Sequence, residues 1–151
     1  MPQSYSSVQV HLVFSTKDRR PFLSTPGLRA EMHSYLGGVS RSMDCPPIIV
    51  GGVADHVHIL ARLGKSVSQS EWAKEVKRVS SVWIKEREPK LEEFAWQGGY
   101  GSFSVDRTTV EKVRRYIERQ EEHHRIHSFQ DEFRAILKQH GIEWDEKYIW
   151  Q

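Results

Sequence analysis

The stretch PPIIVGGVADHVHILARL, residues 46–63, contains the pattern that decides the fold. Two β-rich segments, Ile48–Val50 and His56–Leu63, flank a turn that contains glycine, and this arrangement predicts a β-hairpin. Side chains on a strand point alternately to opposite faces of the sheet, so His56 and His58 share one face of the second strand. The hairpin is therefore expected to aim a pair of imidazoles at a common target.

The segments around the hairpin predict an α+β fold of the ferredoxin-like (RRM-like) type. Residues 7–14 alternate as a strand, with His11 opposite the apolar side chains, and residues 24–39 have a helical pattern. Residues 66–86 are amphipathic at helical spacing, and residues 96–105 return to an extended pattern. The order strand, helix, strand, strand, helix, strand predicts a split βαβ arrangement, an antiparallel sheet with helices on one face.

Capping residues set the expected limits of these two helices. The first is expected to begin after Thr25, with a proline at its first position, and to end at the pair Gly37 and Gly38. In the second, Ser68 and Glu71 form a capping box. Both helices then have the length needed to cover one face of a small sheet.

Two more helices are predicted after the sheet. Residues 108–124 begin with a capping box from Thr108 to Glu111, and residues 128–141 carry an apolar stripe at helical spacing. The aromatic tail that follows is expected to dock on the domain, on a partner subunit or on a ligand. The chain is expected to be one domain, 1–151, composed of a ferredoxin-like core (1–105), a tyrosine helix (106–127) and a C-terminal helix with its tail (128–151).

Length and composition limit the class of protein. With 151 residues, 38% of them hydrophobic and 28% charged, the sequence is typical of a single soluble globular domain. No segment approaches the roughly 20 apolar residues that span a bilayer, and the first residues lack the pattern of a signal peptide. A cytoplasmic protein without membrane contact is expected. The formal net charge of +2 leaves the partner open.

Cysteine usage restricts the metal chemistry. Cys45 is the only cysteine, so one chain can form neither a disulfide nor a cysteine metal cluster. Any metal must therefore be held by histidine and oxygen ligands. Two imidazoles on one strand make a poor site alone, because a useful centre needs a third protein ligand and an open position for the substrate.

The segment RRYIERQ, residues 114–120, offers the missing groups. Tyr116 and Gln120 are four residues apart and so lie one turn apart on the same face of a helix. Two imidazole nitrogens and one amide oxygen leave coordination positions free, which suits Mg²⁺ or Mn²⁺ held in part by substrate phosphate oxygens. A tyrosine that attacks a DNA phosphate forms an ester that keeps the energy of the broken bond. We predict Tyr116 as the nucleophile and His56, His58 and Gln120 as the metal ligands.

Other residues fit these roles less well. Tyr100 lies between glycines, which favours a turn, and no ligand type follows it at helical spacing. His123 and His127 are four residues apart and form a possible second metal site, but a solvated helix end that includes His124 is the preferred interpretation. His11 is interpreted as a residue of the polar face without a catalytic role.

Basic side chains gather in three places, where they would contact the phosphates of a nucleic-acid substrate and raise affinity without reading sequence. They lie in the first loop, along the second helix and beside the tyrosine: Lys17, Arg19, Arg20, Lys74, Lys77, Arg78, Arg115 and Arg119. Ordinary solvation of a helix face is the alternative for this set. Trp144, Tyr148 and Trp150 in the tail are candidates for stacking on unpaired bases, with packing as the open alternative.

Together these motifs resemble a known family. DHVHIL (55–60) resembles the His-hydrophobic-His signature of the HUH endonucleases. YIERQ (116–120) resembles the Tyr-x-x-x-Gln helix of their single-tyrosine branch, the IS-two-hundred-like transposases of small bacterial insertion sequences and their REP-associated relatives. VHLVFSTKDRRP (10–21), FAWQGGYGSFSV (94–105) and FQDEFRAILKQHGIEWDEKYIW (129–150) also look like this family, so the resemblance covers nearly the whole chain.

The resemblance implies a metal-dependent enzyme that nicks and rejoins single-stranded DNA at element ends marked by hairpins. It implies a covalent 5′-phosphotyrosine at Tyr116, with Mg²⁺ or Mn²⁺ at His56, His58 and Gln120. It further implies a homodimer in which the tyrosine helix of one subunit can complete the histidine site of the other.

Two other functions stay open. One is a non-catalytic nucleic-acid-binding module, although the aromatic pattern of RNA recognition domains is absent from the strands. The other is a metal phosphoesterase that activates water. Both leave the spacing of Tyr116 and Gln120 unexplained.

Overall fold

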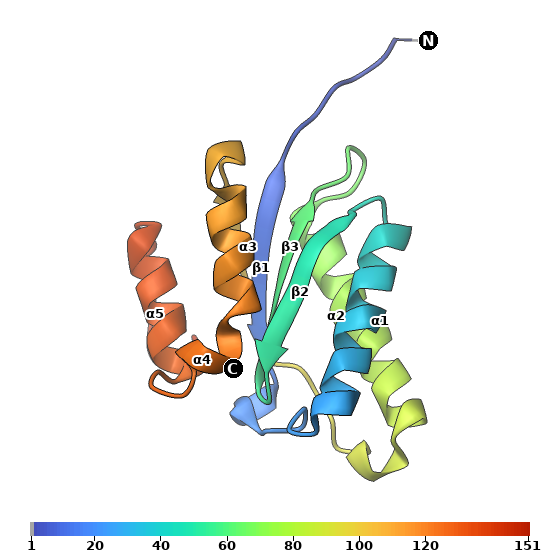
Figure 1. Cartoon of the computed structure of the whole chain (residues 1–151), viewed down its shortest axis with the longest axis vertical. Coiled ribbons are helices and arrows are strands. Elements are labelled where there is room, and N and C mark those ends of the chain that lie inside the picture. Colours follow the sequence, from blue (N-terminus) through green and yellow to red (C-terminus); the bar gives the residue numbers. More distant parts are fainter. Residues whose placement is uncertain (1) are drawn as a thin grey trace.

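The computed structural model describes residues 2–151 and has an antiparallel sheet between two layers of helices (Figure 1). The elements are β1 (Gln9–Ser15), η1 (Lys17–Arg19), α1 (Pro26–Ser42), β2 (Pro47–Val53), β3 (His56–Arg62), α2 (Gln69–Arg87), η2 (Pro89–Leu91), β4 (Gly101–Val105), η3 (Arg107–Thr109), α3 (Val110–Glu118), α4 (Gln120–His123) and α5 (Phe129–Gln139). The strand order β2-β3-β1-β4, with antiparallel neighbours throughout, confirms the predicted ferredoxin-like α+β fold. Within residues 2–151, no helix combines the length and apolar character needed to cross a membrane.

The β2–β3 hairpin places the histidine pair in the middle of the sheet. β3 lies between β2 and β1, with His58 opposite Gly51 on one side and Val13 on the other. Gly52 precedes the two-residue turn with a φ of 154°, and a Cβ at this position would lie 2.3 Å from the carbonyl oxygen of His56. Only glycine fits this close approach. Both glycines lie within β2 and the turn is Ala54–Asp55, so the predicted glycine-containing turn is wrong, although the hairpin itself is confirmed.

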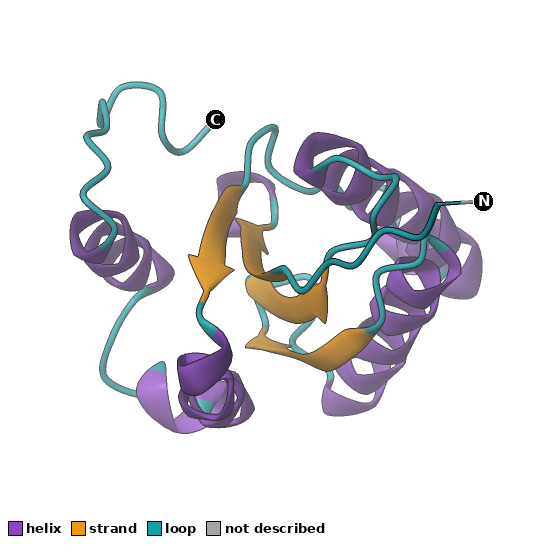
Figure 2. Ribbon diagram, turned by 90° about the horizontal axis from the view of Figure 1, so that it is seen from above, coloured by secondary structure: helices purple, strands orange, loops and turns teal. Residues whose placement is uncertain are grey.

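One face of the sheet packs on α1 and α2 and forms the main hydrophobic core (Figure 2). The strands contribute alternate residues that are at most 3% exposed: Val10, Leu12, Phe14, Val57, Ile59 and Ala61. Trp72 and Val76 of α2 are fully buried against them. The predicted start of α2 is confirmed, since the side chain of Ser68 accepts a hydrogen bond from the backbone N–H of Glu71.

The two helices of the core lie on one face, as predicted, and the added C-terminal helices cover the opposite face. Val13 and Phe103 pack against Phe133 of α5, while Leu60 packs against Ile117 of α3. The physical reason is that both faces of the strands carry apolar side chains, and leaving the second set in water would forfeit its burial. α3, α4 and α5 therefore form a second layer over the histidines.

α1 continues past Gly37 and Gly38, where the sequence pattern predicted its end. A glycine inside a helix costs only about 1 kcal/mol relative to alanine, and Gly37 is buried in contact range of Pro47 in β2. The helix ends instead at Ser42, with Met43 as its C-cap and Asp44 in the left-handed region with a φ of 62°. Packing on the sheet thus outweighs the local preference of the glycines.

The tyrosine helix differs from the prediction at both ends. The side chain of Asp106 accepts a hydrogen bond from the backbone N–H of Thr108 and begins the turn η3, so the predicted capping box from Thr108 to Glu111 is wrong. The helix is also interrupted at Arg119, with α4 following as a separate short helix rather than one helix running to His124. This interruption places α4 beside β2 at the hairpin end of the sheet.

α5 and the tail follow the prediction more closely. Ser128 caps α5 by accepting a hydrogen bond from the backbone N–H of Asp131, and Gly141 ends the segment with a φ of 67°. Trp150 of the tail is partly buried against Phe133, while Tyr148 is 56% exposed. The tail therefore docks on its own domain through part of its aromatic side chains.

Candidate metal centre and nucleophile

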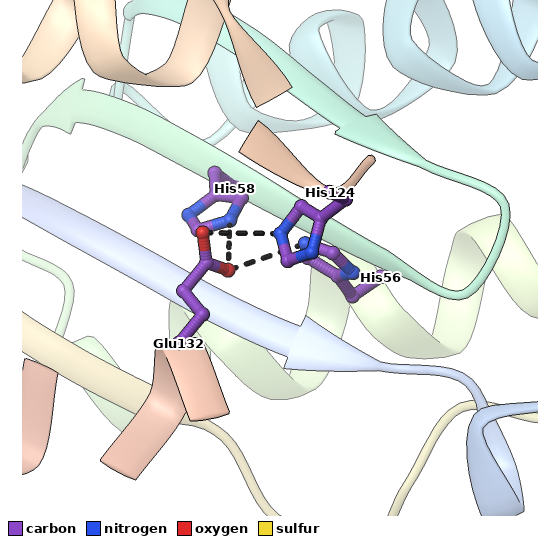
Figure 3. A group of neighbouring side chains, drawn as sticks. All are labelled: His56, His58, His124 and Glu132. Carbon is purple, nitrogen blue, oxygen red and sulfur yellow. Dashed lines mark hydrogen bonds and ion pairs between the residues drawn. The ribbon is translucent and has the colours of Figure 1, made fainter. Parts of the chain in front are cut away.

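His56 and His58 project from β3 toward α3–α5, and both side chains are fully buried. The Nε2 atom of His58 lies 3.0 Å from Oε1 of Glu132 on α5, and the Nε2 atom of His56 lies 3.3 Å from the same oxygen. Figure 3 shows both rings turned toward this carboxylate. The prediction that the two histidines share a face is confirmed, and that face is directed at a buried glutamate.

The second oxygen of Glu132 is surrounded by groups from α3, α4 and the residue that follows α4. The hydroxyl of Tyr116 donates a hydrogen bond to Oε2, and the amide nitrogen of Gln120 donates to it over 3.1 Å. The Nε2 atom of His124 lies 3.1 Å from the same oxygen. One carboxylate thus joins the predicted nucleophile to three candidate ligands.

Gln120 connects His56 of β3 with His124 through its side-chain oxygen. Its side-chain oxygen lies 3.0 Å from Nε2 of His56 and 3.0 Å from Nε2 of His124, and the residue is 1% exposed. The four predicted site residues, His56, His58, Tyr116 and Gln120, therefore lie together within one chain, even though the helix is interrupted between the last two.

The outer nitrogens of the three histidines are held by separate partners. Nδ1 of His56 lies 2.7 Å from a carboxylate oxygen of Asp55, and Nδ1 of His58 lies 2.8 Å from Nε2 of His11. Nδ1 of His124 donates to the backbone carbonyl of His127 over 2.6 Å. Each Nε2 atom is thereby directed into the centre, which is the arrangement of imidazoles that bind metals. His11, expected only on the polar face, is a buried partner of His58.

The charges and lone pairs around Glu132 favour a bound cation. Burial by itself would raise the pKa of Glu132, but hydrogen bonds from His124, His56 and His58 outweigh it and hold the pKa well below its usual range. Burial likewise opposes the charged form of His56, yet the carboxylates of Asp55 and Glu132 raise its pKa to about 9. Carboxylate, amide oxygen and imidazole lone pairs all converge here, so protons or a metal ion must supply positive charge.

The donor set fits a divalent metal ion. His56, His58, His124 and Glu132 each offer one ligand atom, and these four atoms lie within 4.8 Å of one another. Ligands at about 2.0–2.2 Å from a shared ion are separated by up to about 4.4 Å, so small inward movements would complete such a centre. The oxygen of Gln120 lies among the same atoms.

Tyr116 is held as a neutral hydroxyl in the metal-free chain. Burial raises its pKa, and the negative charge of Glu132 raises it further. A phenolate therefore needs a nearby cation or a proton acceptor before it attacks. The competing candidate, Tyr100, lies in the segment before β4 and is 38% exposed.

The interpretation of the histidine triplet as a solvated helix end is wrong for His124. Its side chain is 8% exposed and belongs to the centre, whereas His127 is exposed as expected. Glu132 was not predicted at all. Two signals point to them in retrospect: His124 continues the four-residue spacing from Tyr116 and Gln120, and Glu132 is a charge on the apolar stripe of α5.

Two clefts flank Tyr116. One, of about 710 Å³, is lined on α3 and beyond by basic side chains that include Lys112, Arg115 and Arg119. The other, of about 440 Å³, lies between α3 and α5 and includes His11 and Phe103 in its lining. Two of the predicted DNA-binding residues, Arg115 and Arg119, therefore lie beside the nucleophile.

The remaining predicted DNA-binding residues lie farther from Tyr116. α2 covers the other face of the sheet (Figure 1), and on it Lys77 donates to the carbonyl of Gly99 while burial lowers its pKa to about 8. Arg78 is ion-paired with Glu75, and Lys74 is exposed.

The first-loop cations differ in their surroundings. Arg19 donates to the backbone carbonyl of Trp150, and Arg20 pairs with Glu93. Lys17 is exposed. These contacts locate the side chains without testing their role on DNA.

Comparisons with known proteins agree with the fold. The family model described as Transposase IS200 like matches residues 4–120. A Deinococcus radiodurans R1 protein described as a candidate transposase has a TM-score of 0.65 at 19% identity, covering 80% of this chain and 95% of that chain. A REP-associated tyrosine transposase bound to a REP hairpin has a TM-score of 0.54 at 15% identity, and the match covers 80% of this chain and 68% of that chain. No curated protein matches significantly. The structural likeness supports the fold, and the family match over most of the sequence shows that the chain belongs to the IS200-like transposases, enzymes that bind and cleave DNA.

Proposed function

We propose that this transposase nicks and rejoins single-stranded DNA through a covalent 5′-phosphotyrosine intermediate at Tyr116. The observation that carries the proposal is the convergence of the Tyr116 hydroxyl, the two histidines of β3 and Gln120 on the single carboxylate of Glu132. These groups come from separate elements, and a purely structural role for the helix would not need its tyrosine beside buried imidazoles.

In the proposed step, the Tyr116 oxygen bonds to the phosphorus of the scissile diester as the bond from phosphorus to the 3′ oxygen breaks. The hydroxyl, oriented by its hydrogen bond to Glu132, loses its proton to water in the adjoining cleft as the phosphorus–oxygen bond forms, and the departing strand end takes up a proton from water as a 3′-hydroxyl. The 5′ end remains on the tyrosine as a phosphate ester. A free 3′-hydroxyl reverses the step and joins strands without ATP, because the ester keeps the energy of the broken bond.

His56, His58 and Gln120 would hold Mg²⁺ or Mn²⁺ in this proposal. Such an ion, when bound, supplies positive charge to the phosphoryl oxygens and orients the scissile bond. The side chains themselves contribute preorganisation, since the outer nitrogens of both histidines are held by Asp55 and His11.

The substrate is proposed to be single-stranded DNA with hairpins near the element ends. The cleft beside Tyr116 is lined by Lys112, Arg115 and Arg119 as well as by Glu111 and Glu122. Its three basic side chains suit a phosphate backbone that reaches the nucleophile. The REP hairpin bound to a protein of similar fold supports a hairpin substrate.

The covalent adduct tests this function. The chain is incubated with Mn²⁺ or Mg²⁺ and labelled single strands from its own flanking DNA, and then resolved on a denaturing gel. Label is expected to travel with the wild-type protein, to require the metal, and to disappear in Tyr116→Phe but not in the control Tyr100→Phe. Cleavage without an adduct would identify a water-activating phosphoesterase, and binding without cleavage would identify a non-catalytic module.

A mixing experiment separates cis from trans action in the proposed homodimer. Tyr116→Phe and His56→Ala chains are each inactive under the proposal, and a mixture regains activity only if one subunit's tyrosine serves the other's histidines. Because Tyr116 lies beside the histidines of its own chain, cis action predicts no recovery in the mixture.

A further inference from the structure

We infer that His124 and Glu132 are metal ligands in addition to the histidine pair and Gln120, so that the centre selects an imidazole-binding ion such as Mn²⁺, Co²⁺ or Zn²⁺ over Mg²⁺. This inference rests on the proposed metal role of His56 and His58. It adds two ligands from outside the segment that matches the family, since residues 4–120 end before both of them.

The positions of the two side chains carry the inference. His124 directs Nε2 to within 3.1 Å of Glu132 and 3.0 Å of Gln120, while its other nitrogen donates to the carbonyl of His127. A histidine that only capped the helix would point its ring to solvent, but this side chain is 8% exposed. Its Nε2 faces the same space as those of His56 and His58.

Glu132 is the other unexpected group. It is 4% exposed on a helix face otherwise made of Phe129, Phe133 and Ile136, where an unpaired carboxylate would be costly. Its two oxygens contact the imidazoles and the amide but no arginine or lysine side chain among residues 2–151. A carboxylate that is buried among imidazoles without a fixed cation fits a metal ligand.

The donor chemistry determines which ion is preferred. Three imidazole nitrogens, one carboxylate and one amide oxygen form a nitrogen-rich set, which suits Zn²⁺ and Co²⁺ best, with Mn²⁺ bound more weakly than either. Mg²⁺ prefers oxygen ligands at octahedral positions and retains several waters. Five buried protein donors leave few positions for such waters, so Mg²⁺ should bind weakly.

Calorimetric titration of the metal-free full chain tests the inference without relying on activity. MnCl₂, ZnCl₂ and MgCl₂ are titrated into the wild type, His124→Asn and Glu132→Gln, with His127→Asn and Asp131→Asn as matched controls. The control side chains are exposed and lie three residues and one residue away, respectively. Circular dichroism identifies any variant that fails to fold.

Mn²⁺ and Zn²⁺ are expected to bind the wild type at least about 100-fold more tightly than Mg²⁺. His124→Asn and Glu132→Gln are each expected to weaken Mn²⁺ and Zn²⁺ binding by at least about 10-fold, while both controls keep the wild-type affinity. The absorption spectrum of bound Co²⁺ should change in His124→Asn, because one nitrogen ligand is lost. If Glu132→Gln does not fold, His124→Asn still decides the outcome.

Unchanged metal affinity in folded His124→Asn would overturn the inference, as would Mg²⁺ binding as tight as Mn²⁺ binding. These results are separable from failure of the proposed function. A Tyr116 adduct together with unaltered affinities would refute only the extra ligands. Tight nitrogen-rich metal binding without an adduct would refute only the transesterification.

Discussion

The two faces of the sheet are built from the same strands but differ in composition, because only the face covered by α3–α5 adds a buried polar cluster to its apolar side chains. On β3, Val57 and Ile59 face α1 and α2 among apolar side chains, whereas His56 and His58 face α3–α5 among polar ones. Neighbouring residues of a strand can therefore be assigned to different tasks, because alternate side chains enter different environments. Both faces bury apolar side chains, but only the face covered by α3–α5 holds the polar groups of the candidate site.

The energetic difference between the faces follows from burial. Each large aliphatic residue on the apolar face contributes about 1.5–3 kcal/mol by leaving water. On the polar face, the same burial is a cost that hydrogen bonds and opposite charges offset, and such clusters are weak contributors to stability. The polar cluster is therefore best explained by its chemistry.

The largest expected effect is on the polar face. His58→Asn should reduce metal-dependent cleavage by more than about 100-fold, since loss of even an outer hydrogen-bond partner of a ligand commonly costs 10–100-fold. Chelation with EDTA should abolish cleavage by the wild type. Cleavage rates of labelled single strands measure both effects, and a variant that retains wild-type cleavage would contradict the separation of tasks.

The neighbouring residue on the apolar face should behave in the opposite way. Ile59→Ala is expected to lower the free energy of unfolding by about 2–5 kcal/mol, because it leaves a cavity in the main core. Urea denaturation measures this loss. The folded fraction should bind Mn²⁺ as the wild type does, and a matching loss of metal affinity would show that the two faces are coupled.

Gly51 in β2 and Gly37 in α1, which packs against β2, give a second test of the difference between the two faces of the sheet. A Cβ on Gly51 would lie 2.8 Å from the backbone oxygen of Ile117 in α3, whereas a Cβ on Gly37 in α1 would meet Pro47 at 3.6 Å, an ordinary contact. Gly51→Ala should displace the helix that carries Tyr116 and lower adduct formation by about 10-fold or more. Gly37→Ala should instead stabilise the chain by about 0.5–1 kcal/mol. Adduct yield and urea denaturation of both variants test the pair.

Two histidines should give opposite pH dependences of stability in EDTA. Burial and the charge of Arg29 lower the pKa of His33 on α1 to about 4, so the unfolded chain binds a proton first and stability is lost as the pH falls from about 6.5 to 4. The pKa of His56 is raised to about 9, so its contribution is full below pH 6.5 and is lost as the pH rises to 9. The free energy of unfolding, measured by urea denaturation, should fall less steeply at acid pH in His33→Gln than in the wild type. In His56→Asn it should fall less steeply at alkaline pH.

The smallest effect concerns DNA affinity. Arg115 lines the cleft beside Tyr116, 3.5 Å from a carboxylate oxygen of Glu111, whereas Arg78 lies on α2 over the other face of the sheet and pairs with Glu75. Arg115→Ala should reduce the slope of log affinity against log salt by about 0.7, the value for one phosphate contact of single-stranded DNA. Arg78→Ala is expected to leave the slope nearly unchanged. An equal reduction of this slope in both variants would indicate that DNA also contacts the face of the sheet covered by α2.

Much of the fold could be predicted because its signals are local. Alternation predicted the hairpin and the shared face of His56 and His58, and helical spacing predicted that Tyr116 and Gln120 would lie together. Features that depend on packing between distant segments could not be predicted from the sequence. The end of α1 at Ser42, beyond the glycine pair, and the docking of the C-terminal helices over the second face both reflect contacts with the sheet rather than a local motif.

The sequence by itself determined the order of elements, the two faces of β3 and the residue types available for metal and phosphate chemistry. These follow from the periods of strands and helices, which short segments encode. Only the tertiary structure decided that His124 and Glu132 join the centre. Their positions depend on how α4 and α5 dock, through contacts such as those of Val13 and Phe103 with Phe133, and residues far apart in the chain leave no local pattern that shows this.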